Sequence, residues 1–185
     1  MAESGSRLGG ISFRPLRTED LPCLRRWLSE GPSLQWYASG SAPTEEAILA
    51  KYLPRIRGDE RVRSWLMTSG GVDAGFFQDH LLREVPGHPA AAIAPDFAGI
   101  DYFLAPEFIG QGLGPRAISA FVQDVFRRER GVLGCCADPD PENQRSVRAL
   151  RKAGFRKMPG DDPARHPGAI LLCIPRPNEG EPPGA

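Results

Sequence analysis

The chain has 185 residues, 41% of them hydrophobic and 25% charged, and its 23 acidic and 23 basic side chains balance to a net charge of zero. This length and composition fit one globular domain, and no apolar run is long enough to span a membrane. No signal peptide is visible in residues 1–10, so we expect a cytoplasmic protein. Four cysteines without a Cys-x-x-Cys pair and three scattered histidines do not indicate a metal, and we expect the cysteines to be small buried side chains.

Helical and strand periodicities alternate from residue 11 to residue 174, which we interpret as a single domain. Residues 1–10 and the tail 175–185 are expected to be disordered. Thr18 and Thr44 can cap two helices, which Gly31 and Pro54 would end, and loops are expected over 32–41 and 83–96. Strands are predicted at 11–16, 63–68, 74–81, 99–104, 131–137, 155–158 and 169–174, and two further helices at 112–128 and 143–153.

The most informative segment joins the strand 99–104 to the helix 112–128 through Gly110-Gln111-Gly112-Leu113-Gly114. A glycine loop at a helix N-terminus turns backbone N–H groups toward one point, where a phosphate is favoured. The glycines allow close approach because no Cβ intervenes. The loop is not a Walker loop and lacks the spacing of dinucleotide-binding folds. Gly-x-Gly-x-Gly alone also occurs in ordinary turns.

The residues that follow make the pattern specific. Asn143-Gln-Arg-Ser146 and, further along, Gly154-Phe155 resemble the Asn-x-x-Ala/Ser…Gly-Phe motif of the GCN5-related N-acetyltransferases. The glycine loop then matches that family's pyrophosphate loop, although Ile109 stands where a Gln or Arg is usual. The resemblance implies an α/β (α+β) fold with a mixed central sheet of about six or seven strands, a splayed strand pair and about four flanking helices. It also implies acetyl-coenzyme A as the cofactor.

Within the family, the chain is most similar to the bacterial aminoglycoside N-acetyltransferases that modify the 6′ amine. The most discriminating pair is Gly99-Ile-Asp101 followed by Gly112-Leu-Gly114. Trp36-Tyr37, Gly75-Phe-Phe-Gln78 and Asp138-Pro-Asp-Pro-Glu-Asn143 also resemble segments of these enzymes. The implied function is resistance by acetyl transfer to the antibiotic.

In this family the pantetheine arm of the cofactor enters between the two splayed strands, which would be 99–104 and 131–137 here. The resemblance places the cofactor site at Tyr102, Phe103, Leu104, Ile109, Gly110, Gln111, Gly112, Leu113, Gly114, Pro115 and Asn143. Capping its own helix is an equally good role for Asn143.

Asp101 is the expected catalytic residue, because the resemblance places its carboxylate beside the substrate amine, where it would orient the amine and pass a proton to water. Trp36, Tyr37, Gln78 and Asp138 would join Asp101 in binding a cationic small-molecule amine. Structural roles remain alternatives: a strand-end carboxylate for Asp101, a turn cap for Asp138 and core packing for Trp36.

Leu150 stands where many relatives carry the Tyr that protonates the coenzyme thiolate. Leucine cannot donate a proton, so that role would pass to water or to the substrate ammonium, or be missing.

Charge is unevenly distributed: residues 30–110 carry 11 acidic and 6 basic side chains, whereas residues 111–160 carry 5 acidic and 10 basic. The first balance suits a cationic substrate and the second a phosphate-bearing cofactor, although chance clustering is an alternative. No nucleic-acid partner is expected, because the basic stretch lacks interleaved aromatic residues, and no membrane partner is expected, because the apolar runs are too short. The chain is expected to be a monomer or a homodimer.

Three other functions compete. Acyltransferases of siderophore hydroxylysine look similar but usually have a His at the position of Asp101, and protein N-terminal acetyltransferases are a further acceptor class. A non-catalytic coenzyme-A-binding sensor is supported only by Leu150.

Overall fold

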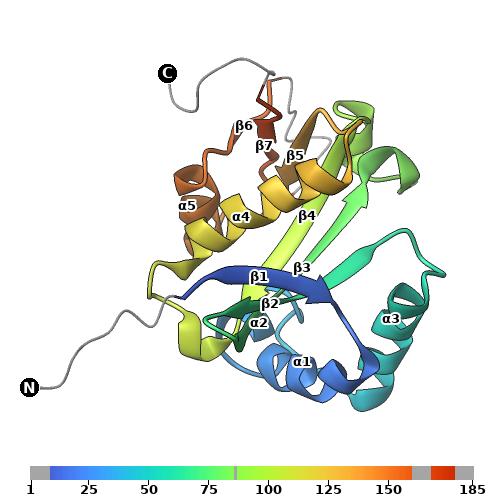
Figure 1. The fold of residues 1–185 in the computed structure, drawn as a ribbon, viewed down its shortest axis with the longest axis vertical. Helices are drawn as coiled ribbons and strands as arrows, with labels where there is room; N and C mark the ends of the chain where they lie inside the picture. Colours follow the sequence, from blue (N-terminus) through green and yellow to red (C-terminus); the bar gives the residue numbers. More distant parts are fainter. Residues whose placement is uncertain (1–8, 86, 160–167, 178–185) are drawn as a thin grey trace, which may run out of the picture.

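The computed structural model describes residues 9–85, 87–159 and 168–177. Its centre is a seven-stranded mixed sheet in the order β1-β2-β3-β4-β5-β7-β6 (Figure 1). The strands are β1 (Ile11–Pro15), β2 (Arg63–Ser69), β3 (Val72–Leu81), β4 (Phe97–Leu104), β5 (Gly134–Ala137), β6 (Arg156–Lys157) and β7 (Leu172–Pro175). The α-helices are α1 (Leu21–Leu28), α2 (Gly31–Trp36), α3 (Glu45–Arg57), α4 (Leu113–Arg128) and α5 (Gln144–Lys152). Short 3-10 turns are η1 (Thr18–Asp20), η2 (Leu82–Glu84), η3 (Pro89–Ala92) and η4 (Pro106–Phe108).

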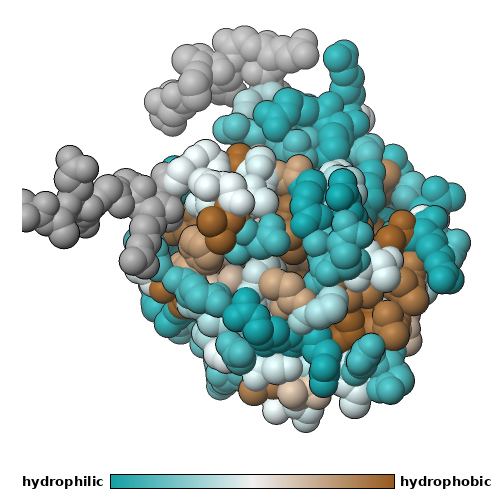
Figure 2. All heavy atoms as spheres, turned by 60° about the horizontal axis from the view of Figure 1, so that its bottom comes forward, coloured by the Kyte–Doolittle hydropathy of each residue, from teal (hydrophilic) through white to brown (hydrophobic). Residues whose placement is uncertain are grey.

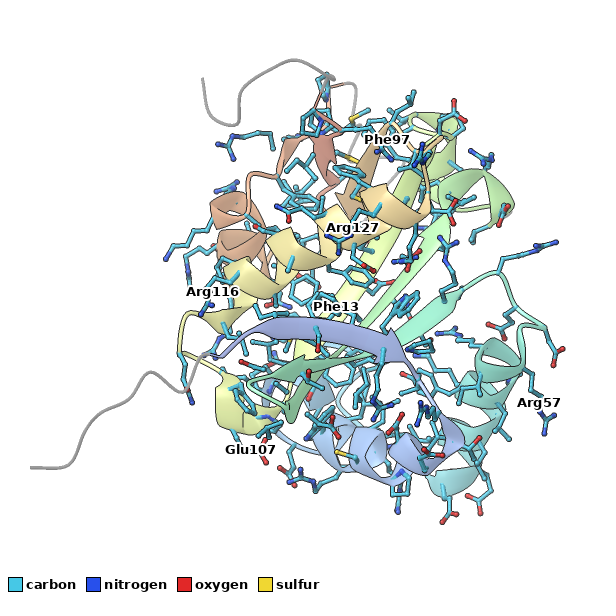
Figure 3. All side chains as sticks on the ribbon, in the orientation of Figure 1. Phe13, Arg57, Phe97, Glu107, Arg116 and Arg127 are labelled. Carbon is cyan, nitrogen blue, oxygen red and sulfur yellow. A yellow bond between two sulfur atoms is a disulfide. The ribbon has the colours of Figure 1, made fainter. Side chains whose placement is uncertain are left out.

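The sheet separates two apolar layers because successive strand residues point to opposite faces. Leu66 and Phe76 join the buried cluster that includes α1 and α3, whereas Met67 and Phe77 join the cluster that includes α4 and α5. Phe13 of β1 closes the second layer against Phe121 of α4, with ring centroids 5.0 Å apart (Figure 3). Seen from the α1–α3 end, hydrophilic side chains cover most of the surface, with apolar patches between them (Figure 2).

The two central strands β4 and β5 part from each other. They pair in parallel only from Phe97–Gly99 to Gly134–Cys136, whereas β3 and β4 pair along their whole facing length, from Gly75↔Leu104 to Leu81↔Ala98. β4 continues to Leu104 after β5 ends at Ala137. Within the described residues, no strand pairs with the side of Ile100–Leu104 that faces β5. The splayed strand pair expected from the sequence is confirmed.

Several helix boundaries differ from the sequence-based prediction. Thr18 does not cap α1 but begins the 3-10 turn η1, and α1 ends at Leu28, so Gly31, predicted to end this helix, begins α2 instead. The predicted loop 32–41 begins with the helix α2, where the Ser33 hydroxyl donates to the carbonyl of Glu30 at 2.9 Å. Pro54 does not end α3, which continues to Arg57. Proline removes one helical hydrogen bond, but the buried Tyr52 and the ion pair of Arg55 with Glu60 hold the turns on either side of it. Gly58, with a φ of +80°, ends the helix instead.

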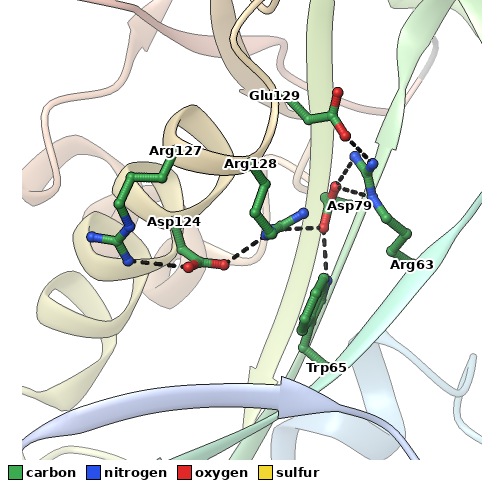
Figure 4. A network of polar contacts seen from close by, with 7 residues as sticks. All are labelled: Arg63, Trp65, Asp79, Asp124, Arg127, Arg128 and Glu129. Atoms are coloured by element: carbon green, nitrogen blue, oxygen red, sulfur yellow. Dashed lines mark hydrogen bonds and ion pairs between the residues drawn. The ribbon is translucent and has the colours of Figure 1, made fainter.

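A buried carboxylate connects β2, β3 and α4 (Figure 4). Asp79 is fully buried and accepts hydrogen bonds from Arg63 Nε at 2.8 Å, Trp65 Nε1 at 2.7 Å and Arg128 at 3.1 Å. The Arg128 guanidinium also lies 4.2 Å from the centroid of the Trp65 ring. A buried charge with this many donors is satisfied, and it fixes the C-terminal end of α4 to the sheet.

The cysteines only partly follow the expectation. Cys135 and Cys136 point to opposite faces of β5 as expected, and Cys135 is buried and free. Cys136, however, lies directly opposite Cys173 of β7 and is joined to it by a disulfide. Adjacent antiparallel partners bring the two Cβ atoms within bonding reach, which the sequence spacing of 37 residues does not reveal.

Within the part of the chain that the structure describes, no helix is long and apolar enough to cross a membrane. The same residues hold no cluster of three or more His, Cys, Asp or Glu side chains that could bind a metal ion.

Candidate active site

A cleft of about 560 Å³ opens where β4 and β5 part. Most of the predicted site residues line it: Trp36, Tyr37, Asp101, Tyr102, Phe103, Leu104, Ile109, Gly110, Gly112, Gly114, Pro115, Asp138 and Asn143. Gln78, Gln111 and Leu113 do not line the cleft. The strand split therefore brings together residues from both halves of the chain.

The glycine loop forms one end of the cleft and leads into α4. Gly110 and Gly112 have φ values of +84° and +76°, and Gly112 is the left-handed residue that caps the helix. A side chain at either position would be strained by this backbone geometry. The N-terminus of a 16-residue helix thus faces the cleft with free backbone N–H groups and the positive end of its dipole.

Two loop residues take structural positions. Leu113 is fully buried in the core under α4, so only its backbone is available to a ligand. The Gln111 side chain donates to the carbonyl of Glu107 at 2.6 Å and holds the loop against η4. The glycine pattern marks the loop but does not reveal which of its side chains is buried.

Helix α5 forms the adjoining wall, since a Cβ at Gly114 would lie only 3.7 Å from the Cβ of Ala149. Asn143 caps it by accepting a hydrogen bond from the Ser146 N–H at 3.1 Å, the alternative role expected for this residue. The Tyr102 hydroxyl lies 3.0 Å from the Ser146 hydroxyl and connects β4 to α5, and burial raises the pKa of this phenol to about 12. Leu150 is fully buried and lines the cleft, where it cannot donate a proton.

Three basic side chains on α5, which no sequence motif marks, line the same wall. They are Arg145, Arg148 and Lys152, all exposed. Their spacing of three and four residues places them on one face of a helix, which is the signal that would have found them. An anion in the cleft would meet both these cations and the N-terminus of α4.

Asp101 lies in the cleft, on the part of β4 that continues beyond its pairing with β5. Gln78, its partner on β3, donates from Nε2 to Asp101 Oδ2 at 2.8 Å. Arg55 of α3 in turn donates to Gln78 Oε1 at 2.8 Å. Gln78 is buried, so it orients the carboxylate of Asp101 and is not itself a lining residue.

Aromatic side chains form the part of the cleft nearest to α2. Trp36 and Tyr37 both line it. The Tyr37 ring packs edge-on against Phe103 with centroids 4.9 Å apart, and burial raises the pKa of its hydroxyl well above the usual range. The Lys51 ammonium lies 4.8 Å from the centroid of the same ring, and burial lowers its pKa.

Several acidic side chains of residues 30–110 are in ion pairs with arginines, among them Asp79, which is fully buried, and Glu60, Asp96 and Glu107, which are partly exposed. The acidic residues that line the cleft are Asp101, Asp138 and Asp140. The acidic character available to a cation is therefore local and close to Asp101.

Comparisons with known proteins agree with this geometry. A family model described as an acetyltransferase (GNAT) domain matches residues 17–160. An aminoglycoside N(6′)-acetyltransferase type 1 from Klebsiella pneumoniae is 29% identical over 151 residues, which cover 80% of this chain and 75% of that protein. A kanamycin resistance protein from Rhizobium radiobacter is 37% identical over 65 residues, or 35% of this chain and 59% of the other.

Among solved structures, aminoglycoside acetyltransferase AAC(6′)-Ib in complex with coenzyme A and kanamycin is 27% identical, with a TM-score of 0.79 over 90% of this chain and 95% of the other. The same enzyme with ribostamycin and coenzyme A gives a TM-score of 0.79 at the same identity and covers 90% of this chain and 94% of the other. The match extends over nearly all of both chains.

Proposed function

Because the chain belongs to the acetyltransferase (GNAT) family, we propose that it transfers the acetyl group of acetyl-coenzyme A to the 6′ amine of an aminoglycoside antibiotic. The observation that carries the proposal is the split between β4 and β5, which brings the glycine-capped N-terminus of α4 and the carboxylate of Asp101 into one cleft. The named relatives that act on aminoglycosides support the choice of acceptor.

The cofactor would lie along the split. Its pyrophosphate would meet the N–H groups after Gly112 and the cations of α5, and its pantetheine arm would pair with the free edge of Ile100–Leu104. Backbone pairing of this kind places the thioester beside Asp101 without requiring a specific side chain. The reacting carbon and the acceptor are then held within one cleft, which lowers the entropic cost of their encounter.

The acceptor amine would bind against Asp101. An ammonium has to lose one proton before its nitrogen can attack and a second when the amide forms, and a carboxylate fixed by Gln78 can orient the amine and receive one of them. The leaving thiolate takes up the other proton. Because Leu150 cannot supply it, that proton would come from water or from the substrate ammonium.

The proposal is tested by incubating the purified protein with acetyl-coenzyme A and a kanamycin-type aminoglycoside and following both free coenzyme A and product mass. We expect a single added acetyl group, and no product from an analogue that carries a hydroxyl at the 6′ position. Asp101→Asn is expected to lower kcat by about 100-fold while leaving coenzyme A affinity unchanged.

Asp59→Asn, at an exposed position after α3, is the matched control and should behave like the wild type. Preferential acetylation of hydroxylysine or of a peptide N-terminus would replace the acceptor in this proposal. Binding of coenzyme A without any turnover would indicate the sensor function.

A further inference from the structure

A second, much smaller cavity adjoins the main cleft, and the two share Asp101 as a lining residue. It measures about 10 Å³, roughly the space that one water molecule needs. Its walls come from β3, β4, the end of β5 and the segment between η2 and η3, so it lies where β4 and β5 begin to part. His80, His88, Asp101 and Asp138 all line it. It therefore connects the proposed catalytic carboxylate to two imidazoles.

His80 is the unusual member of this group. Its exposed fraction is 7%, and neither ring nitrogen has a hydrogen-bond partner among the described residues. Buried polar side chains are nearly always hydrogen-bonded, so an imidazole without a partner beside a water-sized cavity needs an explanation. A water in the cavity would satisfy one of the two nitrogens.

The backbone makes room for this ring. His80 is paired with Gly99 across β3 and β4, and a Cβ at position 99 would lie 2.4 Å from His80 Nε2. Any other residue at this position would displace the imidazole. On the same face of the sheet, Asp101 is two residues beyond Gly99, so His80 lies diagonally across from the carboxylate, within the reach of a ring and one bridging water.

His88 is fixed in a different way. Its Nδ1 accepts a hydrogen bond from the Ala90 N–H at 3.2 Å, and its Nε2 lies 3.9 Å from Asp138 Oδ2. The two imidazole centroids are 5.4 Å apart. With Nδ1 occupied as an acceptor, the neutral ring carries its proton on Nε2 and has no free lone pair for another proton. His88 thus closes the cavity, and of the two imidazoles His80 is the one that can accept a proton.

We propose that His80 is a proton-relay residue, which takes from Asp101, through a water in the cavity, the proton that Asp101 removes from the acceptor amine. This inference rests on the proposed function for the identity of the amine. Asp101 Oδ–H gives its proton to the water, the water gives one to a ring nitrogen of His80, and Asp101 returns to the carboxylate. The imidazolium releases the proton to solvent when the product leaves. No electrons or covalent partners are exchanged.

The electrostatics suit an acceptor that starts neutral. Burial lowers the pKa of His80, His88 and Arg55 act in the same direction, and Asp101 and Asp79 raise it. Among the described residues, the charged or titratable groups on the side of His80 or lining its cavity are Asp101 on β4, His88 before η3, Asp138 after β5 and Arg55 on α3, whereas Asp79, next to His80 on β3, points to the opposite face of the sheet. A neutral imidazole at pH 7 can accept a proton, whereas at a pH below its pKa it cannot.

The kinetic test compares His80→Gln and His80→Phe with the wild type by measuring kcat and KM between pH 5 and 9. Glutamine keeps a polar side chain but does not titrate, so both variants should lose about 10-fold or more in kcat, with KM changed little. The decrease of kcat toward low pH that belongs to His80 should disappear in both. Ionisation of the acceptor amine is common to all three proteins and cancels in the comparison.

His88→Asn is the matched control, because an Asn oxygen can still accept from the Ala90 N–H while the second imidazole is removed. It should keep the low-pH decrease. A His80→Gln protein with wild-type kcat and pH profile, or a His88→Asn protein that loses the low-pH decrease, would overturn the assignment.

A second measurement needs no acceptor and no turnover. The His80 imidazole is titrated by NMR in histidine-labelled protein saturated with coenzyme A, with the resonance assigned by its loss in His80→Gln. Asp101→Asn should lower the titration midpoint of His80, because the negative charge that stabilises the imidazolium is gone. An unchanged midpoint would contradict the relay. If no aminoglycoside is acetylated, the proposed function fails, and this titration still decides whether Asp101 and His80 are coupled.

Discussion

At the scale of single residues, Asp79 shows how a central strand of this fold tolerates a charge. The carboxylate is fully buried, yet four donor atoms from Arg63, Trp65 and Arg128 surround it. Removing one partner of such a group leaves the others buried and uncompensated, which costs more than the net contribution of the intact network.

We therefore expect Asp79→Asn to lower the free energy of unfolding by about 3 kcal/mol, because Arg63 and Arg128 would lose their buried counter-charge and keep only their partly exposed partners Glu129 and Asp124. The ion pair of Arg26 with Glu107 provides the comparison, since both of its side chains are more than half exposed. Glu107→Gln should change stability by less than about 1 kcal/mol. Urea unfolding of the three proteins measures both values, and equal effects of the two substitutions would contradict the role given to the buried network.

At the scale of secondary-structure elements, α5 has a basic face toward the cleft and a basic residue away from it. Arg145 and Arg148 line the cleft, whereas Arg151 is exposed and does not. If the first two bind the phosphates of the cofactor, Arg148→Ala should weaken coenzyme A binding by about 5-fold, the upper range for an exposed ion pair. Arg151→Ala, on the same helix, should leave the affinity unchanged.

Titration calorimetry of coenzyme A binding at low and high salt distinguishes the effects of the two substitutions. The difference between Arg148→Ala and the wild type should shrink as salt screens the exposed charges. Equal losses in both variants would mean that the charge of the helix as a whole, and not its face toward the cleft, attracts the cofactor.

The elements themselves were predictable where local signals agree. The glycine loop, the apolar face of α4 and the cap Asn143 specify their structures within a few residues, and α4, α5 and the β2–β3 hairpin are confirmed close to their predicted ranges. Pro54 misled the prediction, since helix propensity counts its lost hydrogen bond but not the tertiary contacts of α3. The short helix α2 has too few residues to show a period.

The candidate site also has a part that was predictable from the sequence and a part that was not. The glycines and motif residues were predictable, because their backbone conformations depend on local sequence. The link from Arg55 through Gln78 to Asp101 joins α3, β3 and β4, and it follows only from the register of the sheet. The position of His80 opposite Gly99 also depends on that register, so the sequence pattern gave no sign of a buried imidazole beside the carboxylate.

At the scale of the whole molecule, the disulfide between Cys136 and Cys173 joins the strand that borders the cleft to β7 near the C-terminus. A bridge that closes a loop of this length is expected to stabilise the fold by about 4 kcal/mol through the unfolded state. Cys136→Ser/Cys173→Ser should therefore unfold at lower denaturant concentration, and reducing agent should move the wild type toward the variant.

The same reducing agent should have no effect on the double variant, which controls for other consequences of reduction. A wild type with the same unfolding midpoint with and without reducing agent would show that the bridge does not contribute to stability.

The split between β4 and β5 makes the stability of the protein depend on the concentration of its cofactor in the cell. Under the proposed function, the cofactor takes the place of a strand between β4 and β5, so the sheet is complete only when the cofactor is bound. A ligand that binds only the folded state adds about 1.4 kcal/mol to stability for each tenfold rise of its free concentration above the dissociation constant. The amount of folded protein would then follow the concentration of acetyl-coenzyme A, and a cell with little acetyl-coenzyme A would contain less folded protein.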